Sequence, residues 1–252
     1  MAKGLIIFDV GGVFRDSSRA LDEGYRRGYE KAGLPYNFSS EDTWHLRGLG
    51  KYNSGASCIN ALVALTVAKK SLGEILSHDD PESTLDDIVS ENMGEREAML
   101  SKTIIETYKS YFKSEEAGSL VKIFPDASRI LSGLRDKGYA LAIFTNSAKA
   151  TIKRDLADVG IEKFSLILSE EDVKQKKPSG EGILKAMKEL NFSPEHTYYV
   201  GDAVSDIMAA KDAGCKSIAV LWGMGTRRIL EKAKPDYIFN DIKEMAGYFM
   251  RE

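Results

Sequence analysis

A set of polar residues with the chemistry needed for phosphoryl transfer follows successive apolar runs of the sequence. They are Asp9, then Thr145, Asn146 and Ser147, then Lys177, and finally Asp202 and Asp206. Carboxylates gathered in one place repel each other unless they share a hard cation, and such oxygen ligands suit Mg²⁺. A hydroxyl, an amide and backbone N–H groups at the start of a helix suit phosphate oxygens, and a lysine can neutralise a transferring phosphoryl group. These residue types therefore describe an aspartyl nucleophile that attacks phosphorus with the help of Mg²⁺.

The elements that must position these residues are short buried strands. Apolar, β-branched or aromatic runs occupy residues 5–8, 139–145, 164–169, 197–202, 217–223 and 236–239. Helix signals lie between them, with Asp126 as N-cap and Gly138 as closing glycine of one helix, and Ser147 and Gly160 bracketing the next. This alternation predicts an α/β fold, a Rossmann-like parallel sheet between two helical layers. Because the carboxyl ends of parallel strands meet at one edge, the polar residues are expected to converge there.

The segment that follows the first strand has a different pattern. From Ser17 to about Leu120 the apolar residues recur at helical spacing, as in Leu21, Tyr25 and Tyr29, and no strand pattern interrupts them. The sequence therefore predicts two domains. An α/β catalytic core comprises residues 1–16 and 120–252, and an all-helical cap comprises residues 17–119.

Composition limits the classes of partner. The chain has 252 residues, of which 43% are hydrophobic and 29% charged, with a net charge of -3. This balance gives no electrostatic reason to expect nucleic acid or an anionic membrane as partner. The first apolar run is too short for a signal peptide or a membrane span. The two cysteines, Cys58 and Cys215, are far apart and predict reduced thiols in a cytoplasmic protein, and the oligomeric state stays open.

In order, these motifs resemble those of the haloacid dehalogenase superfamily of phosphohydrolases. The family pattern Asp-x-Asp-Gly-Thr/Val corresponds to "DVGGV" at 9–13, and the strand ending in Thr or Ser corresponds to "AIFTNS" at 142–147. The Lys-Pro motif is "KKPSGEGI" at 176–183, and the acidic motif is "GDAVSD" at 201–206. The stretch 124–147 also resembles the branch that contains phosphoglycolate phosphatase. Each motif alone is weak, but the ordered set on strand ends is specific.

The resemblance implies a role for each matching residue. Asp9 would be the nucleophile and Lys177 would stabilise both that nucleophile and the charge of the transition state. The Mg²⁺ ligands would be Asp9, the backbone carbonyl of Gly11 and Asp202. Asp206 would act on the metal through water, or would orient the lysine. Thr145, Asn146 and Ser147 would hold the phosphoryl group. The expected activity is hydrolysis of a small phosphorylated metabolite through an aspartyl-phosphate intermediate.

Gly11 departs from the family pattern. Most family phosphatases have there an aspartate that protonates the leaving oxygen and later activates water. Glycine keeps the carbonyl ligand but removes acid–base assistance, which is worth about 10²–10⁴ in rate. Another group could supply the proton, the substrate could need none, or the protein could be a weak catalyst that mainly binds a phosphorylated metabolite.

The predicted cap offers candidate substrate contacts in "WHLRGLGKYNS" at 44–54, where caps of this superfamily carry their specificity loop. Arg47 and Lys51 are the expected substrate-binding residues, with His45 a further candidate, and a solvated inter-helix loop is the alternative. This loop also loosely resembles the one that carries the Schiff-base lysine of phosphonoacetaldehyde hydrolase. In that alternative, Lys51 would form an imine and the enzyme would cleave a P–C bond.

Overall fold

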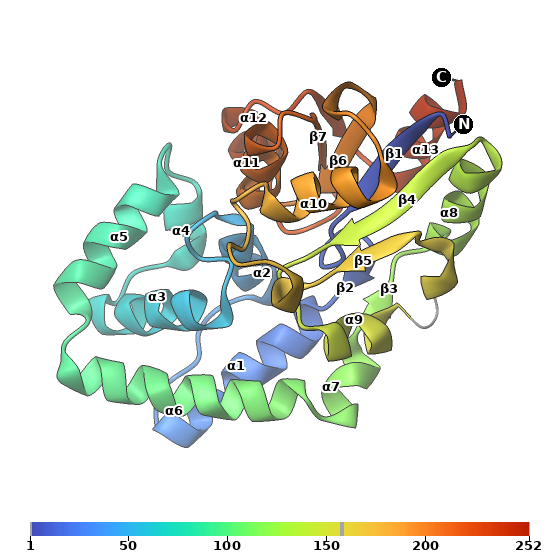
Figure 1. Cartoon of the computed structure of the whole chain (residues 1–252). Coiled ribbons are helices and arrows are strands. Elements are labelled where there is room, and N and C mark those ends of the chain that lie inside the picture. The colour runs from blue at the N-terminus through green and yellow to red at the C-terminus, as the bar shows by residue number, and fades with distance from the viewer. Residues whose placement is uncertain (1, 157–158, 252) are drawn as a thin grey trace. The chain divides into compact units, whose positions relative to one another are not determined.

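The computed structural model describes residues 2–156 and 159–251 of the chain. The chain divides into two compact units, one of residues 1–16 and 123–252 and the other of residues 17–122. The first unit is an α/β sandwich and the second is helical (Figure 1). In the described part of the chain, no helix has the length and apolarity that crossing a membrane requires.

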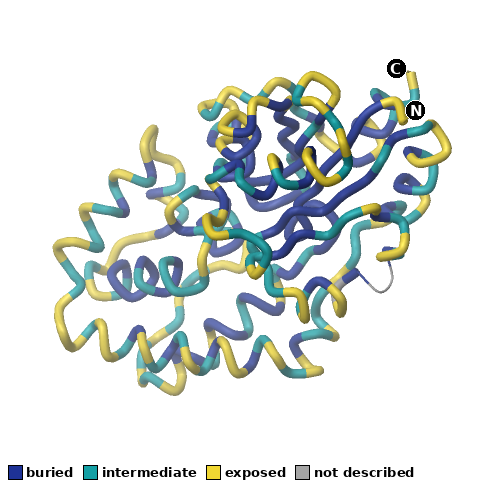
Figure 2. Tube along the Cα trace, in the orientation of Figure 1, coloured by how far each residue is buried: buried dark blue, intermediate teal, exposed yellow. Residues whose placement is uncertain are grey.

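The α/β unit is built on a parallel six-stranded sheet with the order β5-β4-β1-β6-β7-β8. Its strands are β1 (Gly4–Phe8), β4 (Tyr139–Phe144), β5 (Leu166–Leu168), β6 (Thr197–Gly201), β7 (Lys216–Val220) and β8 (Tyr237–Phe239). Every residue of β1 is buried, and Figure 2 shows the central strands as the most enclosed part of this unit. Strands covered on both faces are apolar throughout, which is why they stand out in the sequence.

Helices cover both faces of the sheet. Ile6 and Phe8 of β1 pack with α8 (Ala127–Asp136), α9 (Lys149–Asp155) and α13 (Ile242–Arg251). Leu5 and Ile7 point to the opposite face and pack with α10 (Glu181–Leu190) and α11 (Val204–Asp212). The short helix α12 (Arg227–Lys232) joins α11 against Ala219 of β7. The single-turn helices are η1 (Ile161–Lys163), η2 (Glu170–Asp172) and η3 (Pro194–His196). The predicted α/β fold with a three-layer parallel core is confirmed.

Element boundaries differ from the prediction in informative ways. Asp126 precedes α8, but its φ is 66° and its side chain makes no capping hydrogen bond. Helix α9 begins after Ala148 instead of Ser147, and the Ser147 backbone N–H donates to Thr145 Oγ1. Strands β4 and β6 end one residue before Thr145 and Asp202. The polar residues thus belong to the loops that follow the strands.

The second unit contains helices α1 (Ser18–Ala32), α2 (Ser40–Gly48), α3 (Gly55–Ala68), α4 (Leu72–Leu76), α5 (Pro81–Asn92), α6 (Glu95–Phe112) and α7 (Glu115–Leu120). Helices α1 and α6 approach closely, since a Cβ at Gly28 would lie 2.7 Å from the Ile104 side chain. Two short connecting strands, β2 (Arg15–Asp16) and β3 (Lys122–Ile123), pair with each other. The absence of strands between residues 17 and 121 agrees with the sequence pattern. Its role as a cap stays a prediction.

Candidate active site

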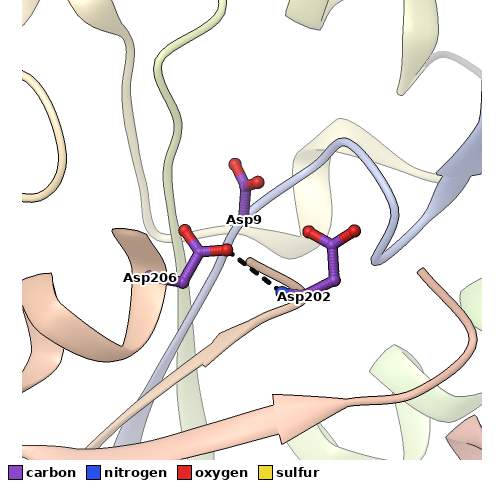
Figure 3. A group of neighbouring side chains, drawn as sticks. All are labelled: Asp9, Asp202 and Asp206. Carbon is purple, nitrogen blue, oxygen red and sulfur yellow. Dashed lines mark hydrogen bonds between the residues drawn. The ribbon is translucent and has the colours of Figure 1, made fainter. Parts of the chain in front are cut away.

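Three buried carboxylates converge at the carboxyl ends of β1 and β6. Asp9 follows β1, Asp202 follows β6, and Asp206 lies in the first turn of α11 (Figure 3). Their exposed fractions are 7%, 0% and 1%. One oxygen of each lies within 4.8 Å of an oxygen of the others. The predicted convergence of Asp9, Asp202 and Asp206 therefore occurs in the structure.

Backbone amides fix two of these carboxylates. Asp206 Oδ2 accepts hydrogen bonds from the N–H groups of Asp202, at 3.1 Å, and of Ala203, at 3.0 Å. Asp202 Oδ2 accepts one from the Met224 N–H at 2.6 Å, in the loop that follows β7. The Gly225 N–H also donates to the Asp202 carbonyl, at 2.9 Å. These bonds leave both side chains little freedom to reorient.

Glycines allow the backbone to approach Asp202. A Cβ at Gly12 would lie 1.7 Å from Asp202 Oδ2, and one at Gly223 would lie 2.3 Å from the same oxygen. Gly12 also has a φ of 70°, in the left-handed region that side chains disfavour. Gly11 shows neither constraint, because its φ lies outside that region and a Cβ there would meet nothing closer than 3.6 Å. The second glycine of the first motif is therefore required by geometry, and the first is not.

Lys177 lies between two of the carboxylates. Its Nζ is 2.6 Å from Asp206 Oδ1 and 3.0 Å from Asp9 Oδ1, and the residue is 9% exposed. Burial alone would lower the pKa of this ammonium group, but the charges of Asp206 and Asp9 outweigh it and raise the pKa well above its ordinary value. The lysine therefore stays charged beside Asp9.

One lysine does not balance the negative charge of the cluster. Burial, and then the charges of Asp206 and Asp9, raise the pKa of Asp202 well above its ordinary value, and burial likewise raises that of Asp206. Among the described residues no donor reaches the buried Oδ1 of Asp202. An oxygen-only ligand set with an unbonded, buried carboxylate oxygen fits a hard divalent cation. Asp9, Asp202 and Asp206 can hold such an ion.

The residues after β4 form a polar turn beside the lysine loop. Thr145 is 2% exposed, and its Oγ1 donates to Ser147 Oγ at 3.4 Å while accepting from the Ser147 N–H at 3.3 Å. The Asn146 carboxamide is engaged by the backbone of Lys177, since Oδ1 accepts from its N–H at 3.0 Å and Nδ2 donates to its carbonyl at 3.2 Å. The Asn146 side chain thus positions the lysine loop.

Sequence reasoning missed Tyr199 and the loop of Gly223 and Met224. The Tyr199 hydroxyl donates to the Phe144 carbonyl at 2.7 Å, and the two rings lie beneath Lys177, with centroids 5.7 and 6.0 Å from its Nζ. Strand alternation could have placed Tyr199 on the same face as other core residues, but not under the lysine. Nothing in the local sequence links Met224 to Asp202, since they are distant in the chain.

Arg47 and Lys51 belong to the helical unit and have different environments there. Arg47 Nη1 donates to the hydroxyls of Tyr25, at 3.3 Å, and Tyr108, at 3.4 Å, and these two rings stack with centroids 5.2 Å apart. No described residue accepts a hydrogen bond from the buried Arg47 Nε. The Arg47 guanidinium therefore has hydroxyl partners in place of a carboxylate.

Lys51, in contrast, has a carboxylate partner. Its Nζ donates to Asp86, and its side chain is 63% exposed. The hydrogen bond to Asp86 and the charge of that residue raise the pKa of Lys51. His45 Nε2 lies 3.9 Å from a Glu41 oxygen, on the same helix.

Comparison with known proteins identifies the family. The sequence model described as haloacid dehalogenase-like hydrolase matches residues 6–220. The chain belongs to this family. The resemblance drawn from the ordered motifs is therefore confirmed, and the match extends over both units of the structure.

Individual members of the haloacid dehalogenase-like hydrolase family resemble parts of the chain. The pyrophosphatase PpaX of Oceanobacillus iheyensis is 33% identical over 143 residues, 56% of this chain and 66% of that protein. The phosphoglycolate phosphatase of Salmonella typhi is 31% identical over 138 residues, 54% of each chain. The matches thus span between about half and two thirds of these relatives.

Solved structures share the fold over the whole chain. The crystal structure of a predicted phosphoglycolate phosphatase from Haemophilus somnus has a TM-score of 0.74 and 22% identity, with 97% of each chain covered. At this identity the likeness concerns the fold alone.

Proposed function

We propose that the chain is a Mg²⁺-dependent phosphatase of a small phosphorylated metabolite, with Asp9 as nucleophile. The observation that carries this proposal is the buried contact of Asp9 Oδ1 with the charged Lys177, at 3.0 Å, within the carboxylate cluster. The relatives named pyrophosphatase and phosphoglycolate phosphatase support phosphorylated substrates. The proposed location is the cytoplasm, with which the free, buried Cys58 and Cys215 are compatible.

The chain's own residues perform the covalent steps. The Asp9 carboxylate attacks phosphorus and becomes an aspartyl phosphate, and water then releases phosphate and restores the carboxylate. Lys177 counters the charge of the transferring phosphoryl group, and Asp206 and the Asn146 carboxamide position Lys177. Thr145 and the backbone N–H of Asn146 bind phosphoryl oxygens, since the Ser147 N–H already donates to Thr145 Oγ1.

The direct metal ligands in this proposal are Asp9, the Gly11 carbonyl and Asp202, and Asp206 contributes to the metal site through water. A bound Mg²⁺ supplies Lewis-acid stabilisation of the phosphoryl oxygens. Asp202 and its amide donor Met224 hold the cluster's shape, and Lys177 limits the repulsion between carboxylates. Asp206 serves chiefly to orient Lys177, because its other oxygen is already bonded to two backbone amides.

The proposed chemistry lacks a proton donor at position 11. Since Gly11 carries no side chain, the general acid expected from the family pattern is absent. Arg47 remains the proposed substrate contact of the helical unit, because its guanidinium has no carboxylate partner among the described residues. Lys51, which pairs with Asp86, is the weaker candidate.

Steady-state phosphate release tests the proposal. Purified protein is assayed with Mg²⁺ against alkyl phosphates, acyl phosphates, pyrophosphate and phosphonoacetaldehyde. Asp9→Asn should lower turnover by roughly 10⁴-fold or more, as loss of a covalent nucleophile does. Asp136→Asn, at an exposed carboxylate of α8, is the matched control and should keep full activity. Turnover by Asp9→Asn at the wild-type rate, or ligand binding without any turnover, would contradict the proposal.

The imine alternative at Lys51 finds less support. An imine-forming lysine must be neutral to attack a carbonyl, whereas Asp86 favours the charged form. Borohydride reduction with phosphonoacetaldehyde should therefore trap no adduct that depends on Lys51. A trapped adduct that Lys51→Ala abolishes would establish the alternative.

A further inference from the structure

Arg15 lies beside the position where a side chain at residue 11 would project. A Cβ at Gly11 would be 3.9 Å from Arg15 Nη2 and 4.0 Å from Arg15 Nε. The Met224 methyl group, at 3.6 Å, is the other neighbour of that point. A guanidinium thus adjoins the place at which the family pattern has its acid.

The backbone of the first loop fixes this arrangement. The Gly12 N–H donates to the Arg15 carbonyl at 2.9 Å, and the Arg15 N–H donates to the Val10 carbonyl at 3.3 Å. Gly11 and Arg15 also form a β-bridge. Arg15 is 7% exposed. The tight turn therefore places the nearly buried Arg15 next to Gly11, in the loop that follows Asp9.

An arginine differs from an aspartic acid in what it can give a leaving group. Its guanidinium keeps its protons at every physiological pH, so it cannot serve as a general acid. It can bind an oxyanion through two parallel N–H groups and stabilise charge that develops on it. A fixed cation therefore assists a group that departs as a stable anion.

We propose, building on the phosphatase function above, that Arg15 binds an anionic leaving group and directs the enzyme toward phosphoanhydrides and acyl phosphates. Their shared chemistry is a leaving oxygen that departs as phosphate or carboxylate and needs no proton. An alkyl ester would have to release an alkoxide, for which neither Arg15 nor Gly11 supplies a proton.

The reaction balances without a general acid. An Asp9 oxygen forms a bond to phosphorus while the bond from phosphorus to the leaving oxygen breaks, and its electron pair stays on that oxygen. The phosphate or carboxylate so formed departs as an anion next to Arg15. Water then attacks the phosphorus of the aspartyl phosphate, the bond to Asp9 breaks, and the proton of water passes to the released phosphate or to solvent.

Substrate selectivity of Arg15 variants tests this proposal. The wild type, Arg15→Gln and Arg15→Lys are assayed for kcat/KM with pyrophosphate, acetyl phosphate and 2-phosphoglycolate. Arg19→Gln, at an exposed arginine, is the control for a change of net charge. We expect the wild type to prefer pyrophosphate, acetyl phosphate or both over 2-phosphoglycolate by about 10²-fold or more. Arg15→Gln should lose about 10²–10³-fold on the preferred substrate, at least ten times its loss on 2-phosphoglycolate, and Arg15→Lys should lose less.

The outcomes separate the two proposals. A preference confined to pyrophosphate identifies a phosphate leaving group, and one confined to acetyl phosphate identifies a carboxylate. Equal loss of kcat/KM on all three substrates would assign Arg15 a structural role and overturn the inference. A wild-type preference for 2-phosphoglycolate would also overturn it. In both cases Asp9-dependent hydrolysis would still uphold the phosphatase function. Absence of turnover on every substrate would overturn both. If Arg15→Gln does not fold, the wild-type preference and Arg15→Lys decide.

Discussion

Asp202→Asn removes one of three buried carboxylates while it keeps the shape of the side chain and its acceptor for the Met224 amide. Asp202 is fully buried, and its Oδ1 has no donor among the described residues. Two unit charges at most 4.8 Å apart repel by about 3.5 kcal/mol or more at an effective dielectric constant near 20. Lys177 offsets part of the repulsion from Asp9 and Asp206. We therefore expect the substitution to stabilise the metal-free protein by about 2 kcal/mol, or roughly 4–8 °C in Tm.

The pH dependence of this gain follows from the direction of the pKa shift. Folding raises the pKa of Asp202, so the carboxylate destabilises the folded protein. Below the unfolded-state pKa, near ~3.9, both states are protonated and the charge has no effect. The wild type loses stability as pH rises from there through the raised pKa of the folded state. The advantage of Asp202→Asn should therefore be absent in acid and grow over this range.

Thermal unfolding with EDTA and with excess Mg²⁺ measures both effects. Mg²⁺ at 100 times its Kd should stabilise the wild type by about 2.7 kcal/mol, and Asp202→Asn should lose most of this increment together with activity. Asp236→Asn is the control of opposite sign, because hydrogen bonds from Ser217 lower the pKa of Asp236 despite partial burial. A lower Tm for Asp202→Asn in EDTA, combined with a wild-type response to Mg²⁺, would refute the reasoning.

Further predictions concern the first loop and the tyrosine beneath the lysine. Gly12→Ala should lower both Tm and turnover, because its Cβ would overlap the Asp202 carboxylate at a φ of 70°, whereas Gly11→Ala should fold with nearly unchanged Tm. Equal tolerance of the two substitutions in thermal scans would contradict this. Tyr199→Phe removes the hydrogen bond of 2.7 Å from the Tyr199 hydroxyl to the buried Phe144 carbonyl, and should lower the free energy of unfolding, measured with denaturant, by about 1–3 kcal/mol. An unchanged unfolding midpoint would show that the bond contributes nothing. Gly11→Asp places a carboxylate beside the Arg15 guanidinium, and the guanidinium should hold that carboxylate ionised. The variant's gain in the rate of alkyl-ester hydrolysis should therefore stay below the ~10²–10⁴ that a general acid supplies. A gain at the top of that range would contradict the placement of Arg15.

The sheet and the polar residues at strand ends were predictable because both depend on local patterns. Buried parallel strands are continuously apolar, so the polar residue that ends each run, such as Asp9 or Asp202, is conspicuous. Their convergence then follows from the topology of a parallel sheet. The ordered motifs added the family, which the match over residues 6–220 confirms.

The parts that sequence reasoning missed depend on contacts between distant segments. The amide of Met224 holds Asp202, and the backbone of Lys177 occupies both polar atoms of the Asn146 side chain. The proximity of Arg15 to residue 11 depends on the local turn, but no residue pattern specifies where its guanidinium points. Asp126 is the N-cap residue of α8 as expected, but it adopts a φ of 66° and its side chain makes no capping bond. The cap assignment and the roles of individual site residues stay predictions.

Trapping the aspartyl phosphate tests the central claim most directly. Without an acid–base residue at Gly11, activation of water in the second step should be slowed along with the first, by about 10²–10⁴, so an aspartyl phosphate formed from an activated substrate should accumulate. Enzyme in excess over acetyl phosphate, with Mg²⁺, is quenched in acid during a single turnover and mapped by peptide mass spectrometry. The account predicts one phosphoryl group on Asp9, absent from Asp9→Asn and from samples in EDTA. Phosphate release without any phosphoryl group on Asp9, or with the group on another residue, would contradict it.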